Sequence, residues 1–143
     1  MIVYLDASAL VKRYVAEAGS SEVGALTDAA SALGTSIVSR AEVSAALARA
    51  VRLRVLTRPA GTAAQRAFAG DWADLIRVQL GEPLVARAAS LAWEHGLRGY
   101  DAVHLASALW WREAVGDAVT VATYDRELWR SARAAGLAVW PGR

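Results

Sequence analysis

Short runs of apolar and β-branched residues alternate with longer stretches of helical periodicity along all 143 residues. The strand-like runs cover residues 1–5, 35–38, 118–122 and 137–140. The first run is almost continuously apolar, which is typical of a strand buried on both faces. A chain that alternates in this way favours a parallel sheet with right-handed crossovers and helices on both faces. We therefore predict an α/β fold of three layers, α/β/α, with a central, mostly parallel sheet.

The helical segments are predicted from apolar spacings of three and four and from residues that end helices. Gly19 is expected to end the first helix, and the serines that follow it can cap the second. Gly34 is expected to precede the second strand. Ser39 opens a long helix that Pro59 and Gly61 close. The predicted helices cover residues 7–18, 20–32, 39–56, 62–79, 83–95, 101–115 and 125–135.

Composition bounds the organisation of the chain. A length of 143 residues without a linker or an internal repeat predicts a single domain over residues 1–143. Cysteine is absent, which excludes disulfides, thiolate metal ligands and a cysteine nucleophile. No segment reaches the roughly 18 apolar residues of a membrane helix, so we expect a cytoplasmic protein with no membrane partner. A formal net charge of +2 is only weak evidence for a nucleic-acid partner.

Four acidic residues stand at comparable places, near the points where predicted strands end or helices begin. Asp6 follows the first strand, and Glu42 lies in the first turn of the helix after the second strand. Asp101 opens a helix, and Asp125 follows the strand over residues 118–122. In an open α/β sheet, ligands bind at the carboxyl ends of the strands. We therefore expect the four carboxylates to gather at that edge of the sheet.

Helix capping is the alternative interpretation of each acidic residue taken alone, because a helix N-terminus favours a negative charge. Ser39 and Glu42 even have the spacing of a capping box. Several carboxylates within about 4 Å, however, repel one another by about 4 kcal/mol per pair at an effective dielectric of 20, and caps do not require this. A hard divalent cation removes the repulsion, and carboxylate ligands favour Mg²⁺ or Mn²⁺ over Zn²⁺.

Such an ion holds a phosphodiester and lowers the pKa of a bound water, so we expect hydrolysis of phosphate esters with water as the nucleophile. Ser8 and Thr123, each two positions from a candidate ligand, are expected to orient a carboxylate or a water, with ordinary turn chemistry as the alternative. His104 shares a helical face with Asp101 and could orient a carboxylate, but we favour its interpretation as a packed or half-exposed histidine.

Basic residues are candidates for holding RNA phosphates. Lys12, Arg13 and Arg40 are expected near the acidic edge, and Arg49 and Arg52 belong to the densest basic run. A solvated helix face is the alternative interpretation of that run.

Four motifs occur in the order found in PIN-domain nucleases, and the sequence resembles the VapC-type toxins among them. Residues 3–12, VYLDASALVK, look like the first motif: an apolar strand, an Asp, a small residue, a Ser or Thr and an apolar helix. Residues 41–43 (AEV), 101–108 (DAVHLASA) and 121–128 (VATYDREL) resemble the second, third and fourth. The resemblance covers the chain except residues 57–82, which could pack as a helical arm.

The resemblance implies an Mg²⁺- or Mn²⁺-dependent endoribonuclease, the toxin of a type II toxin–antitoxin pair. It also implies an RNA substrate, a cognate antitoxin protein and a homodimer. It makes Asp6, Glu42, Asp101 and Asp125 the catalytic and metal-binding residues.

Two alternatives remain open. One is a PIN-like domain that binds RNA or a protein partner without catalysis. The other is a phosphoryl-transfer enzyme or receiver domain that is phosphorylated on Asp6. It would need a second Asp in place of Ser8, or a lysine after a late strand, and neither is present.

Overall fold

The computed structural model describes residues 1–142, which contain a five-stranded sheet in the order β3-β2-β1-β4-β5. Each pair of neighbouring strands is parallel. The strands are β1 (Ile2–Leu5), β2 (Ala32–Ser36), β3 (Ile76–Val78), β4 (Val119–Ala122) and β5 (Ala138–Trp140). In the central strand β1, Val3, Tyr4 and Leu5 are completely buried, as both faces of a parallel sheet require.

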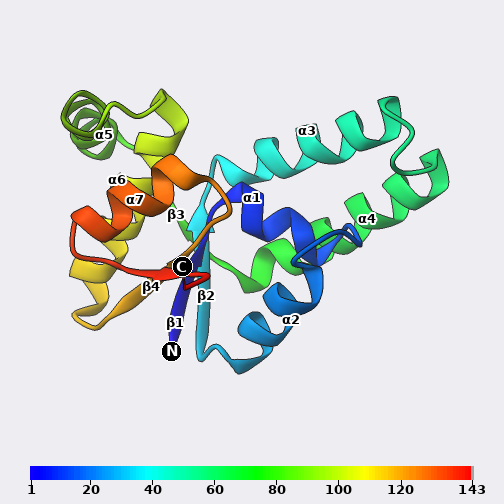
Figure 1. The fold of residues 1–143 in the computed structure, drawn as a ribbon, viewed down its shortest axis with the longest axis horizontal. Coiled ribbons are helices and arrows are strands. Elements are labelled where there is room, and N and C mark those ends of the chain that lie inside the picture. The colour runs from blue at the N-terminus through cyan, green and yellow to red at the C-terminus, as the bar shows by residue number, and fades with distance from the viewer. Residues whose placement is uncertain (143) are drawn as a thin grey trace.

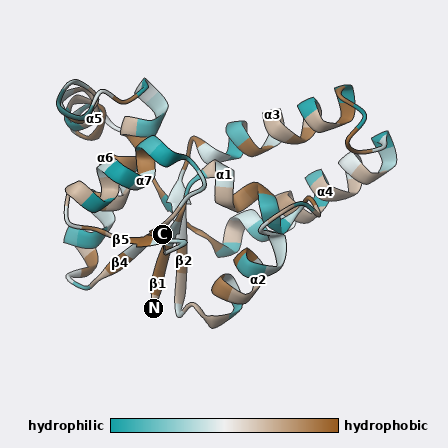
Figure 2. Ribbon diagram, viewed as in Figure 1, coloured by the Kyte–Doolittle hydropathy of each residue, from teal (hydrophilic) through white to brown (hydrophobic). Residues whose placement is uncertain are grey.

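Helices cover both faces of the sheet (Figure 1), so the predicted three-layer fold is confirmed. Tyr4 belongs to an apolar core formed with α5, α6 and α7 on one face, and Val3 and Leu5 to a second core formed with α1 to α4 on the other. Figure 2 shows the hydrophobic colouring of β1 between these layers. The helices are α1 (Ala7–Leu10), α2 (Ser20–Ala29), α3 (Ser39–Arg52), α4 (Arg58–Asp71), α5 (Glu82–His95), α6 (Gly99–Val115) and α7 (Arg126–Ala134).

The helix predicted over residues 7–18 is much shorter than expected. After α1 the chain tightens into a 3₁₀ turn, Val11–Arg13, and then runs irregularly to α2. Gly19 does not end a helix but begins one: it is the N-cap of α2, with φ +91°. Ser20 does not cap α2, because its hydroxyl donates to the carbonyl of Val15 and accepts from the amide of Glu17, which closes the loop.

The second strand begins three residues earlier than predicted. Gly34 lies inside β2, whereas we expected it to precede the strand. A Cβ added at Gly34 would lie 2.6 Å from the ring of Trp111 in α6. Glycine at this position therefore lets α6 pack directly against the sheet. α3 begins at Ser39 as predicted, but it ends at Arg52, before residue 56.

The helix predicted over residues 62–79 is wrong at both ends. α4 begins at Arg58 and is capped by Thr57. Pro59 was expected to lie before this helix, but it lies in its first turn, where proline is tolerated. The chain then passes through a 3₁₀ turn, Trp72–Asp74, into the edge strand β3, which the sequence did not predict. Figure 1 shows α3 and α4 projecting together beyond the sheet, so part of residues 57–82 does form a helical arm.

The helix predicted over residues 20–32 ends three residues early, at Ala29, and residue 32 already belongs to β2. The other predicted elements are confirmed within two residues at each end: β1, α5, α6, β4, α7 and β5. Among residues 1–142, none of the helices has the length and apolar character needed to cross a membrane.

Candidate active site

Asp6 lies at the carboxyl end of the central strand and is 4% exposed. It caps α1, as the capping interpretation expects, because its Oδ1 accepts from the amide of Ala9 at 3.0 Å. The same oxygen also accepts from the hydroxyl of Ser8 at 2.7 Å, and Oδ2 accepts from the hydroxyl of Thr123 at 2.7 Å. Thr123 follows β4, which pairs with β1, so the sheet brings it beside Asp6 across 117 positions.

These donors fix the position of the Asp6 carboxylate, but they do not remove the cost of its charge. Burial raises the pKa of Asp6 above its ordinary value, although the charge of His104 and the hydrogen bonds from Ser8, Thr123 and the Ala9 amide act in the lowering direction. A cation bound at this carboxylate would favour the ionised form.

Glu42 does not form the capping box with Ser39. Val38 is the N-cap of α3 and makes no side-chain cap bond, and the Ser39 hydroxyl is 2.7 Å from that of Thr35. Oε1 of Glu42 instead lies 2.7 Å from Nε2 of His104 in α6. The capping interpretation of Glu42 is therefore wrong.

His104 is 2% exposed and bridges two groups that are far apart in sequence. Its Nδ1 lies 2.8 Å from the hydroxyl of Tyr4 in β1, while Nε2 meets Glu42. Burial alone would lower the pKa of His104, but the hydrogen bond with Glu42 and the charges of Asp6, Glu42 and Asp101 together raise it. The burial of His104 fits its interpretation as a packed histidine, and the contact with Glu42 fits the alternative, in which it orients a carboxylate.

Asp101 and Asp125 both form ion pairs with the side chain of Arg98. Nε of Arg98 donates to Oδ2 of Asp101 at 3.0 Å, and Nη2 donates to Oδ2 of Asp125 at 2.9 Å. Asp101 lies inside the first turn of α6, whose N-cap is Arg98, so Asp101 is not a cap. Asp125 does cap α7, because its Oδ1 accepts from the amide of Leu128 at 2.9 Å.

The electrostatic balance at Asp101 resembles that at Asp6. Its side chain is 7% exposed, and burial raises its pKa; the charge of Asp125 acts in the same direction, whereas the hydrogen bond from Arg98 lowers the pKa. Arg98 is a site residue that the sequence analysis missed. The available signal was an arginine three positions before Asp101, a spacing that suits an ion pair at a helix start.

The predicted RNA-binding residues Lys12, Arg13 and Arg40 each contact a neighbouring side chain of the protein. Arg40 is exposed in the first turn of α3, two positions before Glu42, with its guanidinium 5.9 Å from the ring of Trp72. Lys12 donates to the carboxylate of Glu17 at 3.0 Å and lies 4.4 Å from the ring of Tyr124. The guanidinium of Arg13 lies 5.9 Å from the ring of Tyr14.

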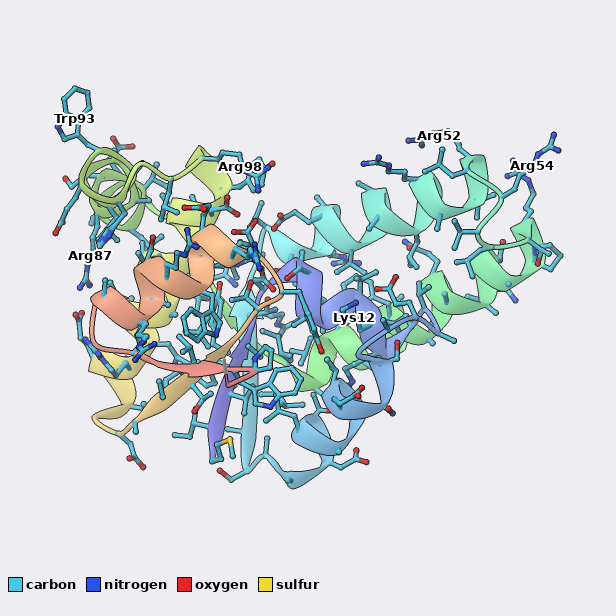
Figure 3. The ribbon with its side chains drawn as sticks, in the orientation of Figure 1. Lys12, Arg52, Arg54, Arg87, Trp93 and Arg98 are labelled. Atoms are coloured by element: carbon cyan, nitrogen blue, oxygen red, sulfur yellow. The ribbon has the colours of Figure 1, made fainter. Side chains whose placement is uncertain are left out.

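Arg49 and Arg52 lie elsewhere. They are exposed in the last turn of α3, which at 1.5 Å per residue is about 10 and 15 Å along the helix from Glu42. Figure 3 shows Arg52 near the tip of the arm, where it lines a groove of about 610 Å³ between α3 and α4. The structure does not bring these two arginines to the acidic edge.

The donor set fits a hard divalent cation, because it consists of carboxylates supported by the hydroxyls of Ser8 and Thr123. Within residues 1–142, no three acidic or histidine side chains converge as a formed ligand shell. The contacts explain this: His104 holds Glu42, and Arg98 holds Asp101 and Asp125. A positive guanidinium between two of the carboxylates shows where positive charge is favoured.

The sequence also matches known proteins. The sequence profile of the PIN domain matches residues 3–134. Ribonuclease VapC49 from Mycobacterium tuberculosis (strain H37Rv) is 45% identical over 143 residues, which cover 99% of this chain and 96% of that protein. Ribonuclease VapC45 from the CDC 1551 strain of the same organism matches with the same identity and coverage.

Solved structures share the fold at lower identity. VapC20 from Mycobacterium tuberculosis, described as a sarcin–ricin loop cleaving toxin, has a TM-score of 0.67 and 17% identity over 94% of this chain and 95% of that chain. FitAcB from Neisseria gonorrhoeae has a TM-score of 0.66 and 19% identity over 98% of this chain and 97% of that chain.

Proposed function

The chain belongs to the PIN-domain family, as a VapC-type member, and on this basis we propose that it is an Mg²⁺- or Mn²⁺-dependent endoribonuclease, the toxin of a type II toxin–antitoxin pair. One observation carries the proposal: α6 links three of the acidic residues, because its His104 contacts Glu42 of α3 at 2.7 Å and its Asp101 shares the guanidinium of Arg98 with Asp125. The family assignment removes the receiver-domain alternative.

In this proposal Asp6, Glu42, Asp101 and Asp125 hold the ion. When bound, the ion would act as a Lewis acid, which polarises the phosphodiester and lowers the pKa of a water molecule. The neutral hydroxyls of Ser8 and Thr123 hold Asp6 in one orientation, so that its oxygens need not reorganise when a cation arrives.

The histidine contributes through Glu42. Because a carboxylate oxygen accepts, Nε2 of His104 is the donor to Glu42, while Nδ1 is hydrogen-bonded to the Tyr4 hydroxyl. Tyr4 is completely buried in the central strand, so this chain of hydrogen bonds fixes Glu42 against the sheet. The second oxygen of Glu42 takes no part in this contact.

The substrate and partners follow the same proposal. We expect Lys12, Arg13 and Arg40 to contribute to RNA binding beside the site, whereas Arg49 and Arg52 would act only on RNA that extends along α3. A cognate antitoxin, a homodimer, a single domain over residues 1–143 and a cytoplasmic location complete the proposal. The names of the VapC relatives support the toxin assignment.

Cleavage of RNA by the purified protein tests the proposal. We expect cleavage with Mg²⁺ or Mn²⁺, none in excess chelator, and a loss of cleavage in Asp6→Ala and Asp101→Asn. If both variants cut RNA as fast as the parent, the assignment is wrong. If the parent binds RNA but cuts none with either ion, the chain is the non-catalytic PIN-like domain of the alternative interpretation.

A further inference from the structure

Arg98 holds an unusual position among the basic residues. Within residues 1–142 it is the one arginine or lysine that forms ion pairs with candidate ligands, at 3.0 Å from Asp101 and 2.9 Å from Asp125. These carboxylates belong to the starts of two different helices, α6 and α7. Arg98 therefore supplies the positive charge that these two carboxylates share.

The guanidinium approaches from the solvent side. The Arg98 side chain is 62% exposed, whereas that of Asp101 is 7% exposed. Its guanidinium carbon lies 5.2 Å from the ring of Tyr100, which is itself partly exposed. Figure 3 shows Arg98 at the N-terminal end of α6, on the side of the molecule where α3 begins. The side chain can leave its two partners without opening either apolar core.

A bound divalent cation would compete with Arg98 for these two carboxylates. Oδ2 of Asp101 and Oδ2 of Asp125 each accept from the guanidinium. An ion held by the same carboxylates would lie close to a positive charge, which is unfavourable. Binding of a cation by these carboxylates is therefore expected to weaken the ion pairs of Arg98.

We propose that Arg98 exchanges partners: it neutralises Asp101 and Asp125 while the metal is absent, and it binds a phosphate of the RNA once the ion has taken those carboxylates. This inference rests on the proposed function. The released guanidinium stays near the site, because its backbone is anchored at the N-cap of α6. Its planar fork of donors matches the geometry of a phosphate group.

Metal binding without RNA tests the first half of the exchange. The Mn²⁺ dissociation constant is measured by electron paramagnetic resonance of free Mn²⁺ for the parent and for Arg98→Gln. Removing a competitor should tighten binding roughly three- to tenfold, a range set by the modest strength of exposed ion pairs. Arg98→Lys, which keeps the charge but loses the two-pronged geometry, should fall between the two.

A matched control is available in the same part of the fold. Arg87 in α5 forms an equally short pair of bonds with Glu113 in α6, at 2.8 and 2.6 Å, away from the candidate ligands. Arg87→Gln should leave the Mn²⁺ dissociation constant unchanged.

Steady-state cleavage at saturating Mn²⁺ tests the second half. Under these conditions the competition is removed, so Arg98→Gln should raise KM for RNA several-fold while kcat changes less. Loss of the phosphate contact predicts this split, and a purely structural role does not.

The outcomes separate this inference from the function on which it rests. If Mn²⁺ binding is unchanged or weaker in Arg98→Gln, or if KM at saturating Mn²⁺ is unchanged, the exchange is refuted. If the parent shows no Mn²⁺ binding that depends on Asp101, the proposed function itself fails. Circular dichroism of each variant identifies any loss of fold.

Discussion

Nε2 of His104 lies 2.7 Å from Oε1 of Glu42, and this contact joins α6 to α3 across 62 positions of the chain. The imidazole is buried and Glu42 is partly exposed, so a group in the interior of the protein holds one oxygen of a carboxylate near the surface. Several testable consequences concern the groups that hold the carboxylates in place.

Replacing His104 should impair activity through Glu42. In His104→Ala the carboxylate loses its orienting donor, and we expect kcat/KM for RNA to fall by about 10- to 100-fold, the range for partners that orient metal ligands. Tyr4→Phe removes only the hydroxyl at Nδ1 and should cause a smaller loss. His95→Ala, at the end of α5, is the control and should match the parent. Full activity of a folded His104→Ala protein would show that the histidine only fills space.

The hydroxyls that hold Asp6 should matter unequally. Ser8→Ala removes a hydrogen bond to Asp6 and the acceptor of the Tyr124 amide. Thr123→Val removes a bond to Asp6 and the acceptor of the amide of Asp125, which is itself a candidate ligand, so it disturbs two candidate ligands. We expect a loss of about tenfold in cleavage rate for Ser8→Ala and a larger loss for Thr123→Val. Ser90→Ala, on the exposed side of α5, is the matched control. Equal rates for all three variants would contradict this role.

The buried charge of Asp6 predicts a pH-dependent stability in the metal-free protein. Because the folded state raises the pKa of Asp6 above 3.8, folding favours its protonated form. The resulting stability is complete below the ordinary pKa and is lost as the pH rises through the raised one. In excess chelator, Asp6→Asn should therefore gain stability over the parent as the pH rises toward neutrality. Thermal unfolding of both proteins at a series of pH values measures this gain, and a difference that does not vary with pH would refute it.

Gly34 should tolerate no larger residue. In Gly34→Ala the new methyl would press on the ring of Trp111, and we expect a loss of roughly 1–3 kcal/mol in the free energy of unfolding. Gly24→Ala in α2 is the control: a Cβ there meets no atom within 4 Å, so this change should stabilise the protein by about 0.5–1 kcal/mol. Urea denaturation compares the two variants, and equal effects would show that α6 yields to the added methyl.

The sequence predicted the acidic positions better than the elements between them. The positions of Asp6 and Asp125 could be predicted because Asp6 directly follows a buried apolar strand and Asp125 lies three positions after another, and strand ends share one edge in a parallel sheet. The edge strand β3 was missed because a strand of three residues is too short to show a periodic pattern. The start of β2 was misplaced because a glycine such as Gly34 is typical of a turn between elements. That glycine is explained only by Trp111, which lies in a distant helix.

The partners of the acidic residues were less predictable than the residues themselves. Glu42 had the spacing of a capping box, and only the crossing of α3 and α6 turns it toward His104. Arg98 lies in a short loop whose conformation brings it to Asp125 across 27 positions, and no local pattern reports that contact.

The pairing of β1 with β4 has a consequence for biosynthesis. Asp6 leaves the ribosome 117 positions before Thr123, which carries its partner hydroxyl, and Asp125 follows Thr123. A nascent chain that lacks these residues cannot assemble the acidic edge. On the proposed function, a chain whose synthesis stops before Asp125 therefore carries no intact site.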